Sequence, residues 1–278
     1  MALIELREVH KRFGRLVVLN GVSLSVEEGE TLVVLGASGT GKSVMLKHMV
    51  GLLSPDKGEV WFDGQRIDNM RVRDLDVIRQ QFGFLFQMGA LFDSFNVEDN
   101  VGFPLVEHTR KSPEEISRIV GEKLAMVGLP ETRKKMPGEL SGGQRKRVAL
   151  ARAIALNPRA ILYDEPTTGL DPIRSDVINE LILKLKRELK VTGVVVTHDM
   201  HSAFKVADRM VMLHEGNVIF NGAPQEIRES ENPIVRSFVL GEAGPEELAG
   251  LEGNGKLAEA IPKSETRLTN QTRTPKAG

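Results

Sequence analysis

The feature that most constrains the fold is a glycine-rich loop between an apolar run and a helical segment. The loop, residues 36–43, reads GASGTGKS; it follows the β-rich apolar run 31–35 and precedes a segment with helical character that ends near Met49. Its spacing fits G-x-x-x-x-G-K-[ST], in which backbone N–H groups surround phosphates at the positive end of the next helix. The order of strand, loop and helix predicts an α/β chain that holds a phosphate-bearing ligand.

The residues of the loop have separate expected roles. Lys42 is expected to bridge the β- and γ-phosphates of ATP, and Ser43 is expected to give its hydroxyl to Mg²⁺. The other residues expected to bind the nucleotide are small and leave room for the phosphates. They are Gly36, Ser38, Gly39, Thr40 and Gly41.

Two neighbouring carboxylates follow a second apolar run. Asp164 and Glu165 come directly after residues 160–163, so they are expected at the C-terminal edge of a buried strand, where ligands of open α/β sheets bind. Asp164 is predicted to hold Mg²⁺ through water, and Glu165 to polarise the attacking water. A lone Asp-Glu pair is more often a solvated strand end, but the glycine loop earlier in the chain favours the catalytic interpretation.

A second candidate anion site begins at residue 140, where the chain reads LSGGQ. Ser141 is a good N-cap, and Gly142, Gly143 and Gln144 would form the first turn of a helix, whose free N–H groups and dipole attract anions. If this site and the glycine loop face apart, one ATP cannot contact both within a single subunit. A twofold dimer, with the loop of one chain opposite the LSGGQ segment of the other, satisfies both sites.

The rest of the chain reads as one domain over residues 1–240. Strands are expected at 3–9 and 17–26, with breaks near Phe13-Gly14 and Asn20-Gly21, then at 160–163 and 193–197, with a helix over about 175–189 between the last two. A helical insertion is expected over about 92–157, and its clearest helix begins at Ser112-Pro113-Glu114-Glu115 and ends near residue 128. Residues 210–213 and 218–220 read as a closing hairpin, and 241–278 as a tail that is flexible or ordered by a partner.

Composition narrows the class of partner. The 278 residues are 41% hydrophobic, enough for an ordinary core, and the 37 basic residues nearly balance the 38 acidic ones, so no strong field favours nucleic acid. The chain has no cysteine, which excludes a disulfide framework and is compatible with a reducing cytosol. No stretch approaches the roughly 18 apolar residues that span a bilayer, so we expect any membrane role to depend on docking to another chain.

With these motifs in place, the chain resembles the nucleotide-binding subunits of ABC transporters from about residue 2 to residue 240. The resemblance implies an α/β P-loop NTPase fold with a mixed, mostly parallel core sheet, an N-terminal antiparallel β subdomain and a helical subdomain. It also implies that Gln87 contacts Mg²⁺ and water, that His198 bonds the γ-phosphate, and that Asp171 couples the two sites of the dimer. Phe13 stands where the family places an aromatic residue that stacks on adenine. The plainer alternatives are a core position for Phe13 and a structural role for His198.

The residues after Gln87 are similar to those of the MlaF-type ATPases of Mla/Mce phospholipid transporters. They read MGALFDS from Met88, with PL at Pro104 and EHT at Glu107. This resemblance implies a homodimer on the cytoplasmic face of the inner membrane, an MlaE-type permease, an Mce-domain protein and, less directly, a STAS-domain MlaB-type subunit held in part by the tail. Because residues 144–147 and 166–169 follow the general ABC pattern, an importer of another solute stays open.

Two further classes fit poorly. An ABC ATPase that acts on DNA or ribosomes needs long insertions, a second ATPase domain or a basic stripe, none of which the sequence offers. A small-molecule kinase would use the glycine loop but has no use for the LSGGQ segment.

Overall fold

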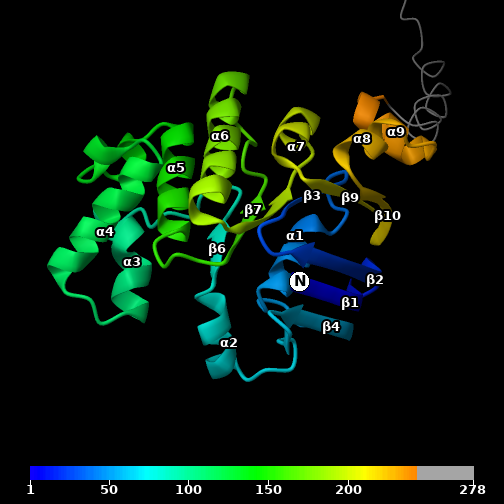
Figure 1. The fold of residues 1–278 in the computed structure, drawn as a ribbon, viewed down its shortest axis with the longest axis horizontal. Coiled ribbons are helices and arrows are strands. Elements are labelled where there is room, and N and C mark those ends of the chain that lie inside the picture. Colours follow the sequence, from blue (N-terminus) through cyan, green and yellow to red (C-terminus); the bar gives the residue numbers. More distant parts are fainter. Residues whose placement is uncertain (243–278) are drawn as a thin grey trace, which may run out of the picture.

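A computed structural model of the protein describes residues 1–242, and a six-stranded sheet forms its centre (Figure 1). The strand order is β10-β9-β3-β8-β7-β6; all neighbours are parallel except β9 and β10, which pair antiparallel. This mixed sheet confirms the predicted fold class. The strands are β3 (Thr31–Leu35), β6 (Phe82–Leu85), β7 (Ala160–Asp164), β8 (Thr192–Val196), β9 (Arg209–His214) and β10 (Asn217–Gly222).

Both faces of this sheet are covered, which explains why its strands read as continuous apolar runs. All five residues of β3 are buried. Val33 and Leu35 pack into a hydrophobic core with the larger helices, whereas Leu32 and Val34 pack into a second core with the N-terminal strands. Side chains alternate between the faces of a strand, so each strand contributes to both cores.

The second core lies under a four-stranded antiparallel sheet with the order β2-β1-β4-β5. The predicted interruption at Asn20-Gly21 is a bulge within a continuous strand: Gly21 has φ +73°, and the pairing with β1 shifts register around it. Strands β4 and β5 were not predicted. The bounds are β1 (Ala2–Phe13), β2 (Leu16–Glu27), β4 (Lys57–Phe62) and β5 (Gln65–Arg66).

Three helices pack against one another at one end of the molecule, shown in green in Figure 1: α3 (Val97–His108), α4 (Pro113–Met126) and α5 (Gly142–Ala153). Helix α4 begins as predicted, since the Ser112 side chain accepts from the Glu115 N–H and the Glu115 carboxylate accepts from the Ser112 N–H. All three helices fall within residues 92–157, which we propose as a helical subdomain.

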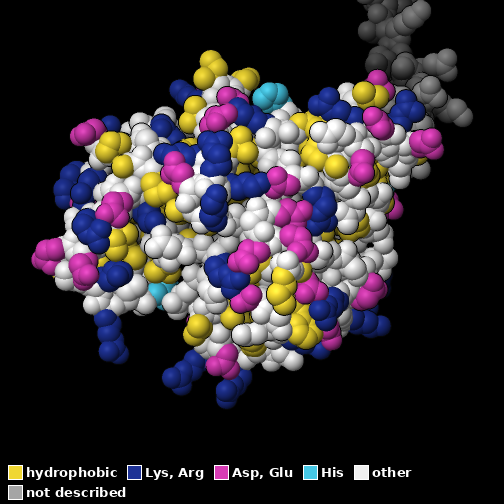
Figure 2. Space-filling model, viewed as in Figure 1, with side chains coloured by type: hydrophobic (Ala, Val, Ile, Leu, Met, Phe, Trp, Pro, Cys, Tyr) yellow, Lys and Arg dark blue, Asp and Glu magenta, His cyan; other side chains and the backbone are white. Residues whose placement is uncertain are grey.

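The remaining helices link or flank the strands. Helices α1 (Lys42–Met49) and α6 (Pro172–Leu189) follow β3 and β7, as predicted. Four helices had no counterpart in the sequence predictions: α2 (Val72–Arg79), α7 (Met200–Val206), α8 (Pro224–Arg228) and α9 (Pro233–Leu240). No helix within residues 1–242 is long and apolar enough to cross a membrane. On the face of the molecule drawn in Figure 2, basic and acidic side chains are interspersed. Apart from Gly241 and Glu242, the predicted tail lies outside the described residues.

Candidate functional site

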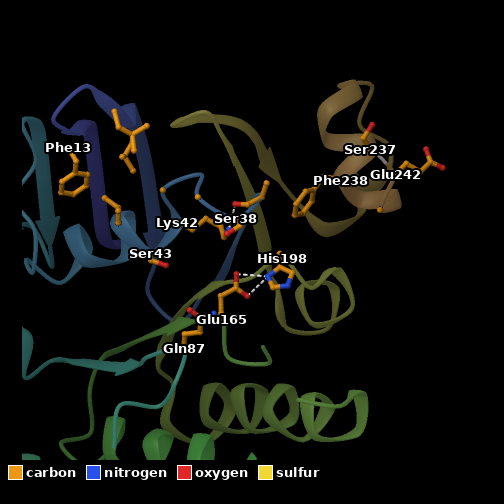
Figure 3. Close-up of a pocket in the computed structure, with 17 residues that line it drawn as sticks. Phe13, Ser38, Lys42, Ser43, Gln87, Glu165, His198, Ser237, Phe238 and Glu242 are labelled. Atoms are coloured by element: carbon orange, nitrogen blue, oxygen red, sulfur yellow. Dashed lines mark hydrogen bonds and ion pairs between the residues drawn. The ribbon is translucent and has the colours of Figure 1, made fainter. Parts of the chain in front are cut away.

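The predicted catalytic residues come together because four parallel strands end at one edge of the sheet. The glycine loop follows β3, Gln87 follows β6, Glu165 follows β7 and His198 follows β8. A pocket of about 810 Å³ opens there and is lined by Lys42, Ser43 and these last three residues, among others (Figure 3). This is the edge at which open α/β sheets bind ligands.

The glycine loop is shaped by residues without side chains. Gly36 has φ +152° and Gly41 has φ +98°; a Cβ atom would lie 2.5 Å from the Leu213 carbonyl oxygen at the first position and 2.7 Å from the Val18 carbonyl oxygen at the second. Both positions therefore require glycine. Thr40 closes the turn, since its hydroxyl donates to the Ala37 carbonyl at 2.9 Å.

Lys42 is buried at the base of this loop. Its ammonium donates to the carbonyl oxygens of Gly36 and Ala37 at 2.7 and 2.8 Å. Burial lowers the pKa of Lys42, while the carboxylates of Glu165 and Asp164 oppose that shift. A phosphate chain in the pocket would supply the compensating negative charge.

The residues expected to hold Mg²⁺ adjoin one another. The Ser43 hydroxyl donates to Asp164 Oδ1 at 2.8 Å, and Gln87 lines the same pocket. Burial raises the pKa of Asp164, an effect that a bound cation would reverse. A hydroxyl, a carboxylate and an amide are oxygen donors of the kind Mg²⁺ prefers, and a site of this kind binds the ion together with substrate phosphates. Within residues 1–242 no group of three or more His, Cys, Asp or Glu forms an all-protein metal cage.

Glu165 and His198 lie side by side in the pocket lining, and their side chains point toward each other (Figure 3). His198 Nδ1 lies 2.9 Å from Glu165 Oε2, and the Thr168 hydroxyl donates to the same carboxylate oxygen at 3.0 Å. Glu165 has φ +51°, a left-handed conformation that is uncommon for a residue other than glycine. Its carboxylate is therefore held by two side chains and by a constrained backbone.

Phe13 lies at the other end of the pocket, at the end of β1, and this residue is 48% exposed. An exposed aromatic ring beside a phosphate-binding loop is available to stack on a nucleotide base, whereas a core phenylalanine would be buried. Lys11 places its ammonium 5.6 Å from the centre of this ring.

The LSGGQ residues and Asp171 do not line this pocket. Ser141 caps α5: its side chain accepts from the Gln144 N–H, and the Gln144 side-chain oxygen accepts from the Ser141 N–H. Asp171 caps α6 by accepting from the Arg174 N–H at 2.9 Å. One chain therefore carries a complete phosphate-binding loop and a separate, outward-facing helix start, Ser141 itself being exposed.

Several pocket residues escaped the sequence predictions. Leu16 and Val18 lie on β2, which pairs with the end of β1 that carries Phe13, and no motif marks them. Ala37 and Val44 lie within and just after the glycine loop. The remaining residues come from α9 and the two residues after it, where no motif marks them. They are Ser237, Phe238, Gly241 and Glu242.

Comparison with known proteins gives the following similarities. The family described as "ABC transporter" matches residues 19–168. The chain is 44% identical over 257 residues, 92% of this chain and 72% of the other, to the "Probable ribonucleotide transport ATP-binding protein mkl" of Mycobacterium tuberculosis. It is 41% identical over 244 residues, 87% of this chain and 91% of the other, to the "Intermembrane phospholipid transport system ATP-binding protein MlaF" of Escherichia coli K12.

A solved structure is also similar. It is a dimeric, post-hydrolysis state of an ATP-binding cassette bound to ADP and Pi, with a TM-score of 0.74 and 37% identity, covering 80% of this chain and 98% of the other.

Proposed function

Because this chain belongs to the ABC transporter family, and is thus an ATPase of the ABC type, we propose that it is the ATP-hydrolysing subunit of a phospholipid transporter of the Mla/Mce type. The observation that supports phospholipid as the cargo is the 41% identity to an intermembrane phospholipid transport ATP-binding protein over 91% of that protein's length. A similarity of this extent includes both the ATPase motifs and the surface that follows Gln87.

In this proposal ATP and Mg²⁺ occupy the interface of a homodimer. Lys42 and the loop bind the phosphates in one subunit, and Ser141, Gly142 and Gly143 of the second subunit close on the γ-phosphate. The outward-facing, capped start of α5 supports this arrangement, as does the similar cassette whose solved structure is dimeric. Asp171, at the start of α6, is then expected close to the twofold axis.

The residues of the pocket divide the hydrolytic work. Asp164, Ser43 and Gln87 would hold Mg²⁺, which would neutralise developing negative charge on the phosphates. Glu165 accepts a proton from, or orients, the attacking water, while His198, whose Nδ1 contacts the Glu165 carboxylate, bonds the γ-phosphate. Loss of the γ-phosphate removes the charge that joins both anion sites, so the dimer opens. The cycle of closing on ATP and opening after hydrolysis is the step that drives the permease.

The partner surface in this proposal lies on both sides of Gln87. Phe86, Met88 and Phe92 are exposed there, with Met88 at 86%, and Phe92 packs against Phe95 and Phe103. Exposed apolar side chains gathered in this way mark interaction sites. We propose that an MlaE-type permease docks on them, with an Mce-domain protein and an MlaB-type subunit completing the complex at the cytoplasmic face of the inner membrane.

A second candidate is an ATPase for another solute. The mycobacterial relative is described as a probable ribonucleotide transport protein and is 44% identical. Both candidates use the same ATPase residues, so only the bound partners and cargo separate them.

The experiment that tests the proposal is purification of the tagged full-length chain from detergent-solubilised native membranes, followed by mass spectrometry of bound proteins and lipids. A permease with an Mce-domain protein and enriched phospholipid is the expected result. Recovery of a permease with a solute-binding protein, without lipid enrichment, would indicate a soluble cargo in place of phospholipid. The roles proposed for the ATPase residues would not change.

A pair of variants identifies the docking surface in the same experiment. Met88→Asp places a charge on the exposed surface after Gln87 and is expected to lose the permease. Val177→Asp places the same charge on α6, where the side chain is 42% exposed, and is expected to retain it. Retention of the permease by Met88→Asp would exclude this docking surface.

A further inference from the structure

A buried lysine that takes no part in phosphate binding joins α5 to the loop after β7. Lys146 lies one turn beyond the start of α5 and is 6% exposed. Its ammonium donates to the carbonyl oxygens of Thr168, Pro166 and Glu165 at 2.7, 2.8 and 3.2 Å. Three N–H donors meet three carbonyl acceptors, so the hydrogen-bonding capacity of the ammonium is filled by one short loop.

That loop carries the catalytic carboxylate in a strained conformation. Glu165 has φ +51°, and a left-handed conformation is strained for a residue other than glycine and persists where its surroundings fix it. Lys146 binds the Glu165 carbonyl directly. It also binds the carbonyl of Thr168, whose hydroxyl orients the Glu165 carboxylate at 3.0 Å.

The first turn of α5 contacts the same segment. A Cβ atom at Gly142 would lie 3.7 Å from Leu170 Cδ2, and one at Gly143 would lie 3.6 Å from Arg174 Cδ. The first turn of α5, which binds the ATP of one site in the proposed dimer, therefore lies beside the end of the Glu165 loop and the start of α6. Because a helix moves as a rigid unit, a displacement of its first turn reaches Lys146 one turn away.

We propose that Lys146 is a positioning residue that fixes the Glu165 loop to α5, so that the contact between LSGGQ and ATP at one site sets the position of Glu165 at the other. The link lies within one subunit and joins the two nucleotide sites of the dimer. This inference rests on the ATP-sandwich dimer proposed above and is independent of the cargo.

The first test compares Lys146→Met with Lys123→Met in the full-length chain, within its membrane complex. Lys123 is a matched control: it is also 6% exposed, on α4, and makes one hydrogen bond, to Asn157 Oδ1 at 2.5 Å. We expect Lys146→Met to lower kcat at least tenfold with the Kd for ATP unchanged, and Lys123→Met to leave kcat within twofold. Lys146→Arg, which retains several N–H donors, is expected to recover most of the loss.

Melting temperatures separate positioning from stability. Both Met variants remove a buried lysine, so both are expected to melt at lower temperature, and kcat is measured well below either transition. Equal kcat values for the two Met variants would overturn the proposal, as would a loss in Lys146→Met that appears only in ATP affinity.

The second test uses heterodimers with two tags, in which one subunit carries Glu165→Gln so that only one site hydrolyses ATP. Lys146→Met is expected to reduce turnover tenfold or more in the subunit with the intact Glu165, and less than threefold in the other. A loss confined to the other subunit would show that Lys146 acts only through LSGGQ and would overturn the positioning role.

A double-mutant cycle measures the coupling itself. Ser141→Ala in the subunit with the intact Glu165 weakens the contact with ATP at the opposite site. It is expected to lower hydrolysis at the intact site only when Lys146 is present, so the two losses are not additive. Additive losses would refute the coupling. If ATP-loaded Glu165→Gln chains show no dimer by size-exclusion chromatography, the sandwich fails, and with it the coupling, while the comparison with Lys123→Met still decides the positioning role.

Discussion

Replacement of Glu165 by glutamine changes one oxygen in a side chain that the structure holds on two sides. The carboxylate is 12% exposed and contacts His198 Nδ1 at 2.9 Å and the Thr168 hydroxyl at 3.0 Å. Glutamine keeps the volume and an oxygen that can accept from Thr168, so the loss is the difference between charged and neutral hydrogen bonds, on the order of 1 kcal/mol of unfolding free energy. The fold and the phosphate-binding loop are expected to survive.

The loss in rate is larger. Removal of a general base or water-orienting group typically lowers turnover 10²–10⁴-fold, which corresponds to about 3–5 kcal/mol of transition-state stabilisation. We expect phosphate release at saturating Mg²⁺ and ATP to fall by at least two orders of magnitude. Nucleotide binding is expected to stay near the wild-type value, and ATP-bound dimers are expected to accumulate because the charge joining the two anion sites persists.

A matched control is Glu122→Gln, the same change in a 55% exposed side chain paired with Arg118 on α4. This control is expected to hydrolyse ATP at the wild-type rate. Turnover of Glu165→Gln within threefold of the wild type would remove Glu165 from its role. A variant that no longer binds ATP would show that the carboxylate supports the pocket rather than the reaction.

Three further changes have defined outcomes. Phe13→Ala is expected to weaken ATP binding by about 1–3 kcal/mol while Phe13→Trp retains it, as measured by equilibrium titration, because stacking needs only an aromatic face. Asn100→Ala is expected to lower the free energy of unfolding by about 2–4 kcal/mol in urea, since this fully buried amide bonds backbone groups of three residues in the loop before α3. Burial lowers the pKa of Lys146 to about 8 against the opposing effect of Glu165, so the unfolded chain binds more protons between pH 8 and 10.5. Across that window the contribution of Lys146 to the free energy of unfolding is expected to rise by up to about 3 kcal/mol. Turnover is expected to fall, because a neutral amine has only two N–H donors for three carbonyls. Melting curves and hydrolysis rates at pH 7.5 and 9.5 check both directions, with Lys146→Arg as the non-titrating reference.

The parts of the site that could be predicted from the sequence are those formed by consecutive residues. The glycine loop, the Asp164-Glu165 pair and the start of α5 each occupy a few consecutive positions, and parallel strands bring their ends to one edge. The capping box at Ser112 was predictable for the same reason, since both partners lie within one turn.

The parts that were missed depend on contacts between distant segments. Nothing near Lys146 indicates that its ammonium meets carbonyl oxygens about twenty residues later. Phe238 reaches the pocket only because β10 and α8 direct α9 toward it. The Asn20-Gly21 pair is a turn signal that strand pairing overrides, because β1 continues opposite both residues.

His198 shows how the two kinds of information combine. The family resemblance assigns this ring to the γ-phosphate, and the structure places Nδ1 against the Glu165 carboxylate, which leaves Nε2 as the atom for a phosphate. A carboxylate and a phosphate are both hydrogen-bond acceptors, and the ring has one nitrogen for each. A ring in that position would hold the Glu165 carboxylate beside the phosphate. The pair of Glu165 and His198 is then a single unit, and Thr168 and Lys146 fix its position from the side of the loop.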